Sequence, residues 1–203
     1  MAVKSLTDCV PDKDWLFEKY GFFKSDGRKK LHLGCGGEYF NGWVNADVSP
    51  QLKTDVCWDL DEFPWPFKDG EFDLAYNANV LEHVKEPVKF INECYRVLKK
   101  DGYLVTLAPH SSDPQMWSDF THLRGLNIQS FQAMFKERWQ ASENSEASGS
   151  FAEIVEKRLL FRRGLYYFWN YLMEPIANWK PEYWENTLGK IFTPPVFVVV
   201  MKK

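Results

Sequence analysis

The sequence lacks the features that mark several large classes of protein. No run approaches the roughly 18 to 20 apolar residues of a membrane-spanning helix, and the first residues lack the apolar core of a signal peptide. The four cysteines form no CxxC pair and show no regular spacing, which argues against a zinc site and favours reduced thiols. We therefore expect a cytoplasmic protein without a bound metal.

A surplus of charge of one sign is also missing. The chain has 25 Lys and Arg residues against 28 Asp and Glu residues, and its formal net charge is −3. Proteins that coat DNA or RNA depend on a strong cationic surplus, so no nucleic-acid partner is expected. The length of 203 residues predicts one domain, residues 1–203, with a core large enough to fold without disulfides.

Short apolar segments alternate with helical patterns along the chain. This alternation predicts an α/β fold with a mostly parallel sheet and helices on both faces. We expect helices at residues 11–20, 86–100 and 130–136, and a polar loop at 141–150. Strands are expected at residues 31–33, 43–48, 54–57, 72–76, 103–107, 151–160 and 196–201.

A glycine loop, residues 34–37, follows the first predicted strand directly. It suits a dinucleotide, the nucleoside and amino-acid ends of S-adenosylmethionine, or no ligand at all if it is a plain turn. The dinucleotide fingerprint GxGxxG requires a third glycine where this chain has Tyr39. Asp47, after the second predicted strand, also comes sooner than the roughly 20 residues that this fingerprint expects.

Further segments follow the loop in a fixed order and include Phe-Pro-Trp-Pro-Phe and Leu-Glu-His-Val. The segments are residues 31–37, 42–47, 59–60, 63–74, 80–84 and 96–104. Over about residues 28–110 the chain resembles the class I S-adenosylmethionine-dependent methyltransferases, in particular the methyltransferase type 11 branch. The resemblance implies a Rossmann-like sheet of seven strands whose last strand is antiparallel.

The resemblance also implies S-adenosylmethionine as the cofactor. Asp47 would accept hydrogen bonds from its ribose hydroxyls, and Asp59 would accept one from the adenine amine. The full set of implied cofactor residues is Gly34, Cys35, Gly36, Asp47, Val48, Asp59, Leu60 and Asn77. Many members carry an acidic residue just before the first glycine; this chain has His32 and Leu33 there, so another acceptor must bind the amino group of the cofactor.

If the methyl acceptor is a hydroxyl, a base must remove its proton, and histidine suits this role near neutral pH. His110 follows the fifth predicted strand, at the end of the sheet where ligands bind. His122 lies in a segment that resembles an Asp-x-Thr-His-x-Arg element of some of these methyltransferases. We expect His110 or His122 to be the base, with Asp119 or Asp113 orienting it.

Structural interpretations of the same segment stay open. Asp119 and Arg124 would form a surface ion pair while His122 caps a turn, and His83 in Leu-Glu-His-Val would serve packing. A metal site is not expected, because its potential ligands have no regular spacing. Those potential ligands are His110, Asp113, Asp119 and His122.

The chain has 9 Trp, 9 Tyr and 16 Phe residues, and nine of these lie among the 24 residues of 161–184. The resemblance implies a short connection here, so we expect a helical insertion at about residues 161–195. It would complete the core, cover the acceptor as a lid, form a homodimer interface or contact a membrane surface.

These observations predict an enzyme that transfers a methyl group from S-adenosylmethionine to a hydroxyl of a small molecule or a sugar-type acceptor. The resemblance of residues 119–124 favours the sugar. The alternatives are methylation of a protein or another macromolecule, and a non-catalytic cofactor-binding module that uses the insertion as a partner interface.

Overall fold

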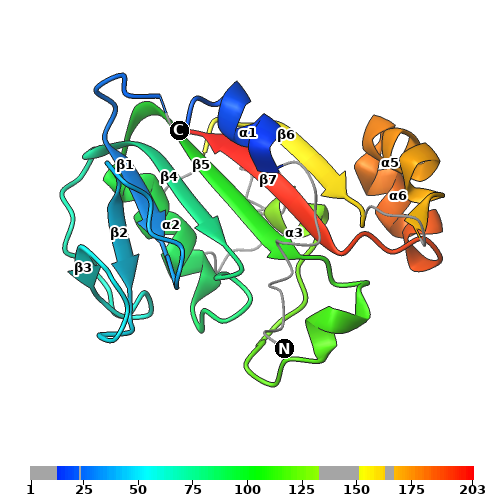
Figure 1. Cartoon of the computed structure of the whole chain (residues 1–203), viewed down its shortest axis with the longest axis horizontal. Helices are drawn as coiled ribbons and strands as arrows, with labels where there is room; N and C mark the ends of the chain where they lie inside the picture. Colours follow the sequence, from blue (N-terminus) through cyan, green and yellow to red (C-terminus); the bar gives the residue numbers. More distant parts are fainter. Residues whose placement is uncertain (1–12, 23, 133–150, 163–166) are drawn as a thin grey trace, which may run out of the picture.

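The computed structural model describes residues 13–22, 24–132, 151–162 and 167–203. Seven strands form one sheet in the order β3-β2-β1-β4-β5-β7-β6 (Figure 1). Only β7 runs antiparallel to its neighbours, β5 and β6, so the predicted Rossmann-like fold is confirmed. The strands are β1 Lys30–Leu33, β2 Val44–Asp47, β3 Val56–Cys57, β4 Phe72–Ala78, β5 Leu98–Pro109, β6 Glu153–Leu160 and β7 Val196–Lys202.

The strand register brings three loops together. β1 lies between β2 and β4, and Leu33 at its end pairs with Ala46 on one side and Asn77 on the other. All three strands are parallel, so their carboxyl ends lie at the same edge of the sheet. The chain order reverses direction at β1, and ligands of open α/β sheets bind at such a switch point.

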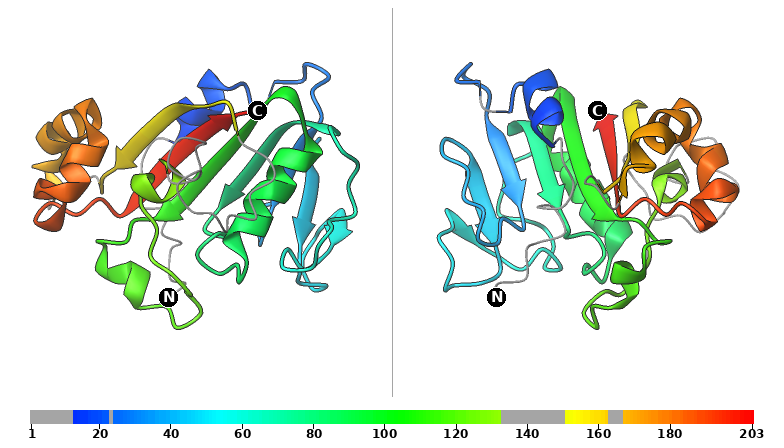
Figure 2. Two further views of the ribbon diagram at one scale, coloured as in Figure 1. Left: turned by 180° about the vertical axis from the view of Figure 1, so that it is seen from behind. Right: turned by 45° about the vertical axis from the view of Figure 1, so that its right-hand side comes forward.

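The sheet has a hydrophobic core on each face, because successive side chains of a strand point to opposite faces. On one face α2 Pro87–Val97 buries Phe90 and Ile91 beside α3 Ile128–Gln132. The other face carries α1 Lys13–Lys19 and the ring of Tyr76. Figure 2 shows the helices on the two sides of the sheet.

The β1–β2 connection departs from the expected alternation. Residues 34–43 contain no helix, and Phe40 and Trp43 instead fold back onto the sheet. The ring of Phe40 stacks on His32 with the ring centroids 4.3 Å apart. Aromatic side chains of a loop thus replace the helix on this face, which accounts for part of the aromatic content.

Other expected elements differ at their ends. α2 stops at Val97 because Leu98 already pairs with Phe72 in the sheet, so β5 starts earlier than expected. α3 begins at Ile128 and is described as far as Gln132. The expected loop at residues 141–150 lies outside the described residues.

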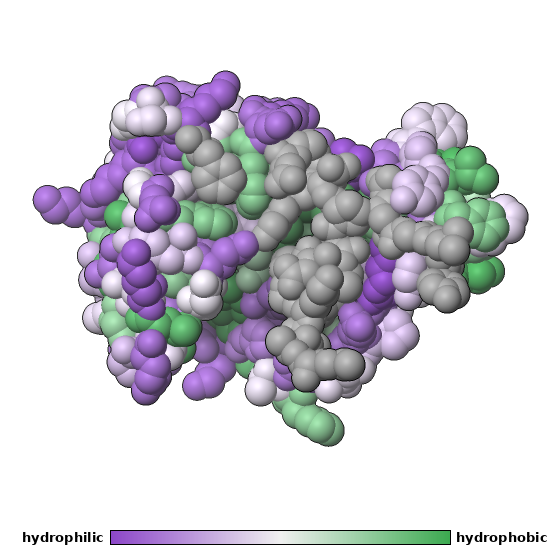
Figure 3. All heavy atoms as spheres, viewed as in Figure 1, coloured by the Kyte–Doolittle hydropathy of each residue, from purple (hydrophilic) through white to green (hydrophobic). Residues whose placement is uncertain are grey.

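Between β6 and β7 the described residues form α5 Asn170–Trp179, α6 Pro181–Asn186 and the short 3-10 helix η4 Leu188–Lys190. They lie at the β6 edge of the sheet, away from β2 and β3 (Figures 1 and 2). Large apolar side chains remain exposed there, and Figure 3 shows this surface beyond β6. They are Tyr167, Phe168, Trp169, Tyr171, Leu172, Ile176, Trp179, Tyr183, Leu188, Ile191 and Phe192. No helix among the described residues has the length and apolar character needed to cross a membrane.

Candidate functional site

A cavity of about 400 Å³ opens at the carboxyl ends of β1, β2 and β4. This is the edge of the sheet that the strand register marks as a ligand site. Most of the cofactor residues expected from the sequence line it. The lining residues are Gly34, Gly36, Asp47, Val48, Asp59, Leu60, Asp61, Asn79, Val80, His83 and Val84.

The glycine loop presents main chain to this cavity. Gly34 has a φ of +64°, and a Cβ built on it would lie 2.4 Å from Cγ2 of Val80. Gly36 has a φ of +53°, and a Cβ there would meet nothing within 4 Å. Gly34 is therefore required by packing, whereas Gly36 leaves open space into which a ligand can approach the backbone.

The carboxylates of Asp47 and Asp59 both line this cavity. Asp47 Oδ2 accepts a hydrogen bond from the Gly36 amide at 2.8 Å, and its Oδ1 accepts one from the Ser49 amide at 2.9 Å. Asp59 Oδ1 accepts from the Asp61 amide at 2.9 Å. Each oxygen keeps a second lone pair, so both carboxylates are held in place and can still accept hydrogen bonds from a ligand.

Two expected cofactor residues do not offer their side chains to the cavity. Cys35 is 3% exposed, and its amide is used in a hydrogen bond to the carbonyl of Ala46. Asn77 is fully buried inside β4 and donates to Thr106 Oγ1 at 3.0 Å. The strand continues beyond Asn77, so Asn79, with a φ of +54°, occupies the position beside the cavity that we expected for Asn77.

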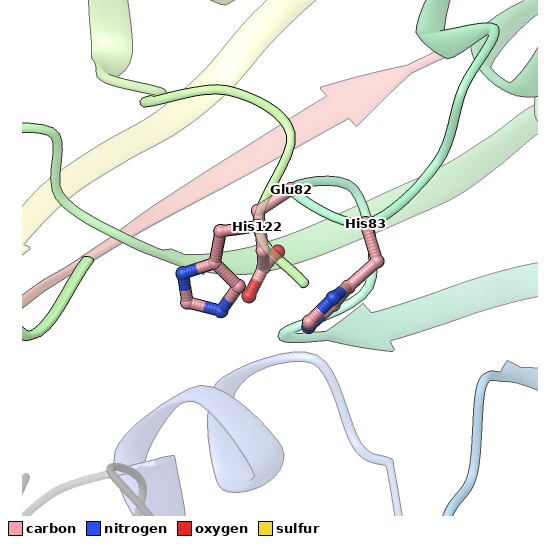
Figure 4. A group of neighbouring side chains, drawn as sticks. All are labelled: Glu82, His83 and His122. Carbon is pink, nitrogen blue, oxygen red and sulfur yellow. The ribbon is translucent and has the colours of Figure 1, made fainter. Parts of the chain in front are cut away.

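A second group of polar side chains adjoins the cavity at His83. Ligand atoms of Glu82, His83 and His122 lie within 4.8 Å of one another. Figure 4 shows the Glu82 carboxylate between the two imidazoles. Glu82 is fully buried, and neither carboxylate oxygen has a hydrogen-bond partner among the described residues. Burial raises the pKa of Glu82 to about 7.

Both imidazoles of this group are oriented through Nδ1. His122 Nδ1 lies 2.6 Å from the carbonyl of Met116, and His83 Nδ1 lies 3.2 Å from the carbonyl of Thr121. A carbonyl only accepts, so each Nδ1 carries the proton and each Nε2 keeps a lone pair. Burial, followed by the neighbouring His122, lowers the pKa of His83 and favours its neutral form.

Residues 119–124 join the loop after β4 to the segment after β5. Asp119 Oδ1 accepts hydrogen bonds from the amide and hydroxyl of Thr121, whose carbonyl accepts from His83. These hydrogen bonds from Thr121 lower the pKa of Asp119. Arg124 donates to the carbonyls of Leu81, Val84 and Lys85. The expected surface ion pair between Asp119 and Arg124 is therefore wrong: the guanidinium binds backbone carbonyls.

His110, one of the two residues expected to act as the base, is not among the residues that line the cavity. It is 2% exposed, with Nδ1 2.7 Å from Ser112 Oγ and Nε2 3.1 Å from Glu185 Oε1. Asp113 is also buried, and its carboxylate binds Arg162 at 2.8 and 3.2 Å. Both side chains connect the end of β5 to the region after β6.

The partnership of Glu82 and His83 with His122 was not predicted from the sequence. His83 was interpreted as a packing residue, and the potential metal ligands all followed the fifth predicted strand. The available signal was topological, because Glu82 and His83 follow β4 while His122 follows β5, its parallel neighbour. Loops after adjacent parallel strands meet at one edge of the sheet.

Comparisons with known proteins agree with this geometry. Residues 31–106 match the model of a methyltransferase domain family. An uncharacterized protein of Methanocaldococcus jannaschii is 30% identical over 50% of this chain and 52% of its own length. A probable S-adenosylmethionine-dependent methyltransferase of Mycolicibacterium smegmatis is 28% identical over 41% of this chain and 39% of its own length. The chain thus spans about half or less of these relatives.

The fold matches that of a solved S-adenosylmethionine-dependent methyltransferase from Archaeoglobus fulgidus. The TM-score is 0.58 at 18% identity, over 93% of this chain and 92% of that one. Residues 31–106 are thus similar to a methyltransferase domain, and the fold is that of a solved S-adenosylmethionine-dependent methyltransferase. The cofactor that this likeness implies is S-adenosylmethionine. The open backbone at Gly36 and the held carboxylates of Asp47 and Asp59 fit that cofactor.

Proposed function

We propose that this chain transfers a methyl group from S-adenosylmethionine to a hydroxyl of a small molecule or a sugar-type acceptor. The observation that supports this most is the position of His83. It lines the cofactor cavity and also belongs to the group with Glu82 and His122. A group able to handle the proton of a hydroxyl therefore lies next to the expected methyl donor.

In this proposal the cofactor, when bound, supplies an electrophilic methyl group on its sulfonium. Gly34 and Gly36 let the backbone approach the methionine part, Asp47 accepts from the ribose, and Asp59 accepts from the adenine amine. Val48 and Leu60 provide apolar contact with the adenine. The residues of the cavity thus bind and orient the cofactor. Orienting the reactants is the main task of a protein in an in-line methyl transfer.

In the chain without a bound metal ion, His122 is the proposed proton acceptor. Its Nδ1 is bound to the carbonyl of Met116, so Nε2 carries the lone pair that a base needs. Asp119 Oδ2 lies 3.8 Å from that Nε2 and would stabilise the charge formed on protonation. The side chain of His122 is 6% exposed, so little water competes for the proton.

The proposal is tested by incubating the purified chain with methyl-labelled S-adenosylmethionine and a panel of sugars, other hydroxyl compounds, proteins and RNA. We expect label in a hydroxyl compound as a base-stable ether. Label found only in protein or nucleic acid would contradict the proposed acceptor class. Cofactor binding without transfer to any member of the panel would favour a non-catalytic module.

A partner contact is proposed for the exposed apolar surface of residues 167–192. Trp179 is 79% exposed and Tyr183 is 69% exposed, and none of these residues lines the cavity. Aromatic side chains are enriched in protein interfaces, which favours a homodimer over a lid. Light scattering of the wild type and of the Trp179→Ser/Tyr183→Ser variant tests it: a wild-type monomer at all concentrations would contradict the contact.

A further inference from the structure

Glu82 is a buried carboxylate that lacks a compensating group. It is fully buried, and neither oxygen finds a hydrogen bond among the described residues. Burying an unpaired carboxylate is costly, so such groups are paired or bind a cation. Glu82 faces two imidazoles at coordinating range, with all ligand atoms within 4.8 Å of one another.

The two imidazoles are arranged as metal-binding histidines are. Each binds a backbone carbonyl through Nδ1, His122 to Met116 and His83 to Thr121. Such a contact fixes the ring and leaves the lone pair of Nε2 directed away from the carbonyl, toward an ion. Thr121 is itself held by Asp119, which completes a second layer of support around the imidazoles.

We propose that Glu82, His83 and His122 bind one divalent transition-metal ion of the zinc type. Two imidazoles and one carboxylate suit zinc and its first-row neighbours better than magnesium. Ligand distances of about 2.0–2.2 Å require ligand atoms roughly 3–4 Å apart, so any longer separation within the group must shorten on binding. His83 is the most exposed of the three ligands and has the most room to move.

Three protein ligands leave open coordination positions. The site adjoins the cofactor cavity, because His83 lines that cavity. This part of the inference rests on the proposed function. The acceptor hydroxyl binds the ion, which lowers its pKa, and its proton passes to water. The oxygen–methyl bond then forms as the sulfur–methyl bond breaks, and S-adenosylhomocysteine leaves. With the ion bound, His122 is a metal ligand, and the ion activates the hydroxyl in its place.

The test is titration calorimetry of ZnCl2 into chelator-treated protein that carries no polyhistidine tag. We expect one ion per chain, and tighter binding of Zn²⁺ than of Mg²⁺. Glu82→Gln, His83→Gln and His122→Gln should each weaken binding by more than the roughly 10- to 100-fold typical of outer-layer changes. Glu86→Gln, an exposed matched acid, and His110→Gln, a matched buried histidine, should bind Zn²⁺ like the wild type.

Thermal unfolding on the same samples separates misfolding from loss of the site. Glu82→Gln removes a buried charge, so without metal it should melt no lower than the wild type. Saturating Zn²⁺ should raise the Tm of the wild type but not that of Glu82→Gln. Folded wild type that binds no Zn²⁺, or ligand variants that bind it equally well, would overturn the metal site.

Binding of S-adenosylhomocysteine distinguishes this inference from the proposed function. Protein that binds S-adenosylhomocysteine but no Zn²⁺ keeps its cofactor site and refutes the metal site. Protein that binds Zn²⁺ but not S-adenosylhomocysteine supports the metal site and removes the proposed methyl transfer.

Discussion

The amide of Leu123 donates a hydrogen bond to the carbonyl of Glu82 over 2.8 Å. This bond joins the loop after β4 to the segment after β5. Arg124 strengthens the connection, because its guanidinium donates to the carbonyls of Leu81, Val84 and Lys85. The Asp-x-Thr-His-x-Arg segment therefore holds Glu82, His83 and His122 in one place.

Replacing Arg124 should loosen that connection. Arg124→Ala removes charge-assisted hydrogen bonds to carbonyls, and we expect about 2–3 kcal/mol less stability in urea unfolding. Zn²⁺ affinity should fall, while affinity for S-adenosylhomocysteine stays near the wild-type value. Arg28→Ala is the matched control, since Arg28 also donates to a carbonyl, that of Gly21, away from the site. Equal Zn²⁺ affinity in both variants would show that Arg124 does not position the ligands.

Gly34 should tolerate no side chain. In Gly34→Ala the new Cβ would clash with Val80 at a positive φ, and we expect a loss of about 2–5 kcal/mol with weaker cofactor binding. Gly27→Ala is the control: its φ is +78° with nothing within 4 Å, so only about 1–2 kcal/mol should be lost. Adding Val80→Ala to Gly34→Ala should recover part of the stability. No recovery would contradict the steric account.

Replacing His110 should lower the stability of the fold and leave the turnover of methyl transfer unchanged. His110→Gln loses the contact with Glu185, which also accepts from the amide of Ile128 at 2.8 Å. We expect about 1–3 kcal/mol less stability in chemical unfolding, with turnover per folded molecule unchanged. A turnover loss of 100-fold or more in folded variant would restore His110 as the candidate base.

Metal removal should stop methyl transfer without releasing the cofactor. The residues proposed to hold S-adenosylmethionine include Gly36 and Asp47, and neither belongs to the Glu82 group. We expect chelator-treated enzyme to bind S-adenosylhomocysteine normally, to lose most turnover and to recover it with stoichiometric Zn²⁺. Full turnover in protein shown to contain no metal would assign proton removal to His122 itself.

The sheet was predictable from the sequence because its signals are local. An apolar run followed directly by a glycine marks β1. Apolar runs also mark residues 103–107 of β5 and 196–201 of β7. The replacement of a helix by Phe40 and Trp43 was not predictable. It depends on the packing of these two rings against His32 in β1 and Tyr76 in β4. Tyr76 is more than 30 residues away in the sequence, so no local pattern reports this contact.

The part of the candidate site that depends on local sequence signals was also predictable. Asp47 and Asp59 follow short strands in a recognisable order, and both line the cavity. Asn77 was assigned to the cavity because the end of β4 was placed too early. The group of Glu82 and His122 depends on two loops meeting, and no local pattern in the sequence reports that distance.

Calorimetry with S-adenosylhomocysteine is the sharpest test of the cofactor site, with NAD as the control ligand. We expect the wild type to bind S-adenosylhomocysteine and not NAD. Asp47→Asn should weaken that binding by roughly 10- to 100-fold, because a charged acceptor for the ribose is lost. Folded protein that binds NAD, or that fails to bind S-adenosylhomocysteine, would contradict the account.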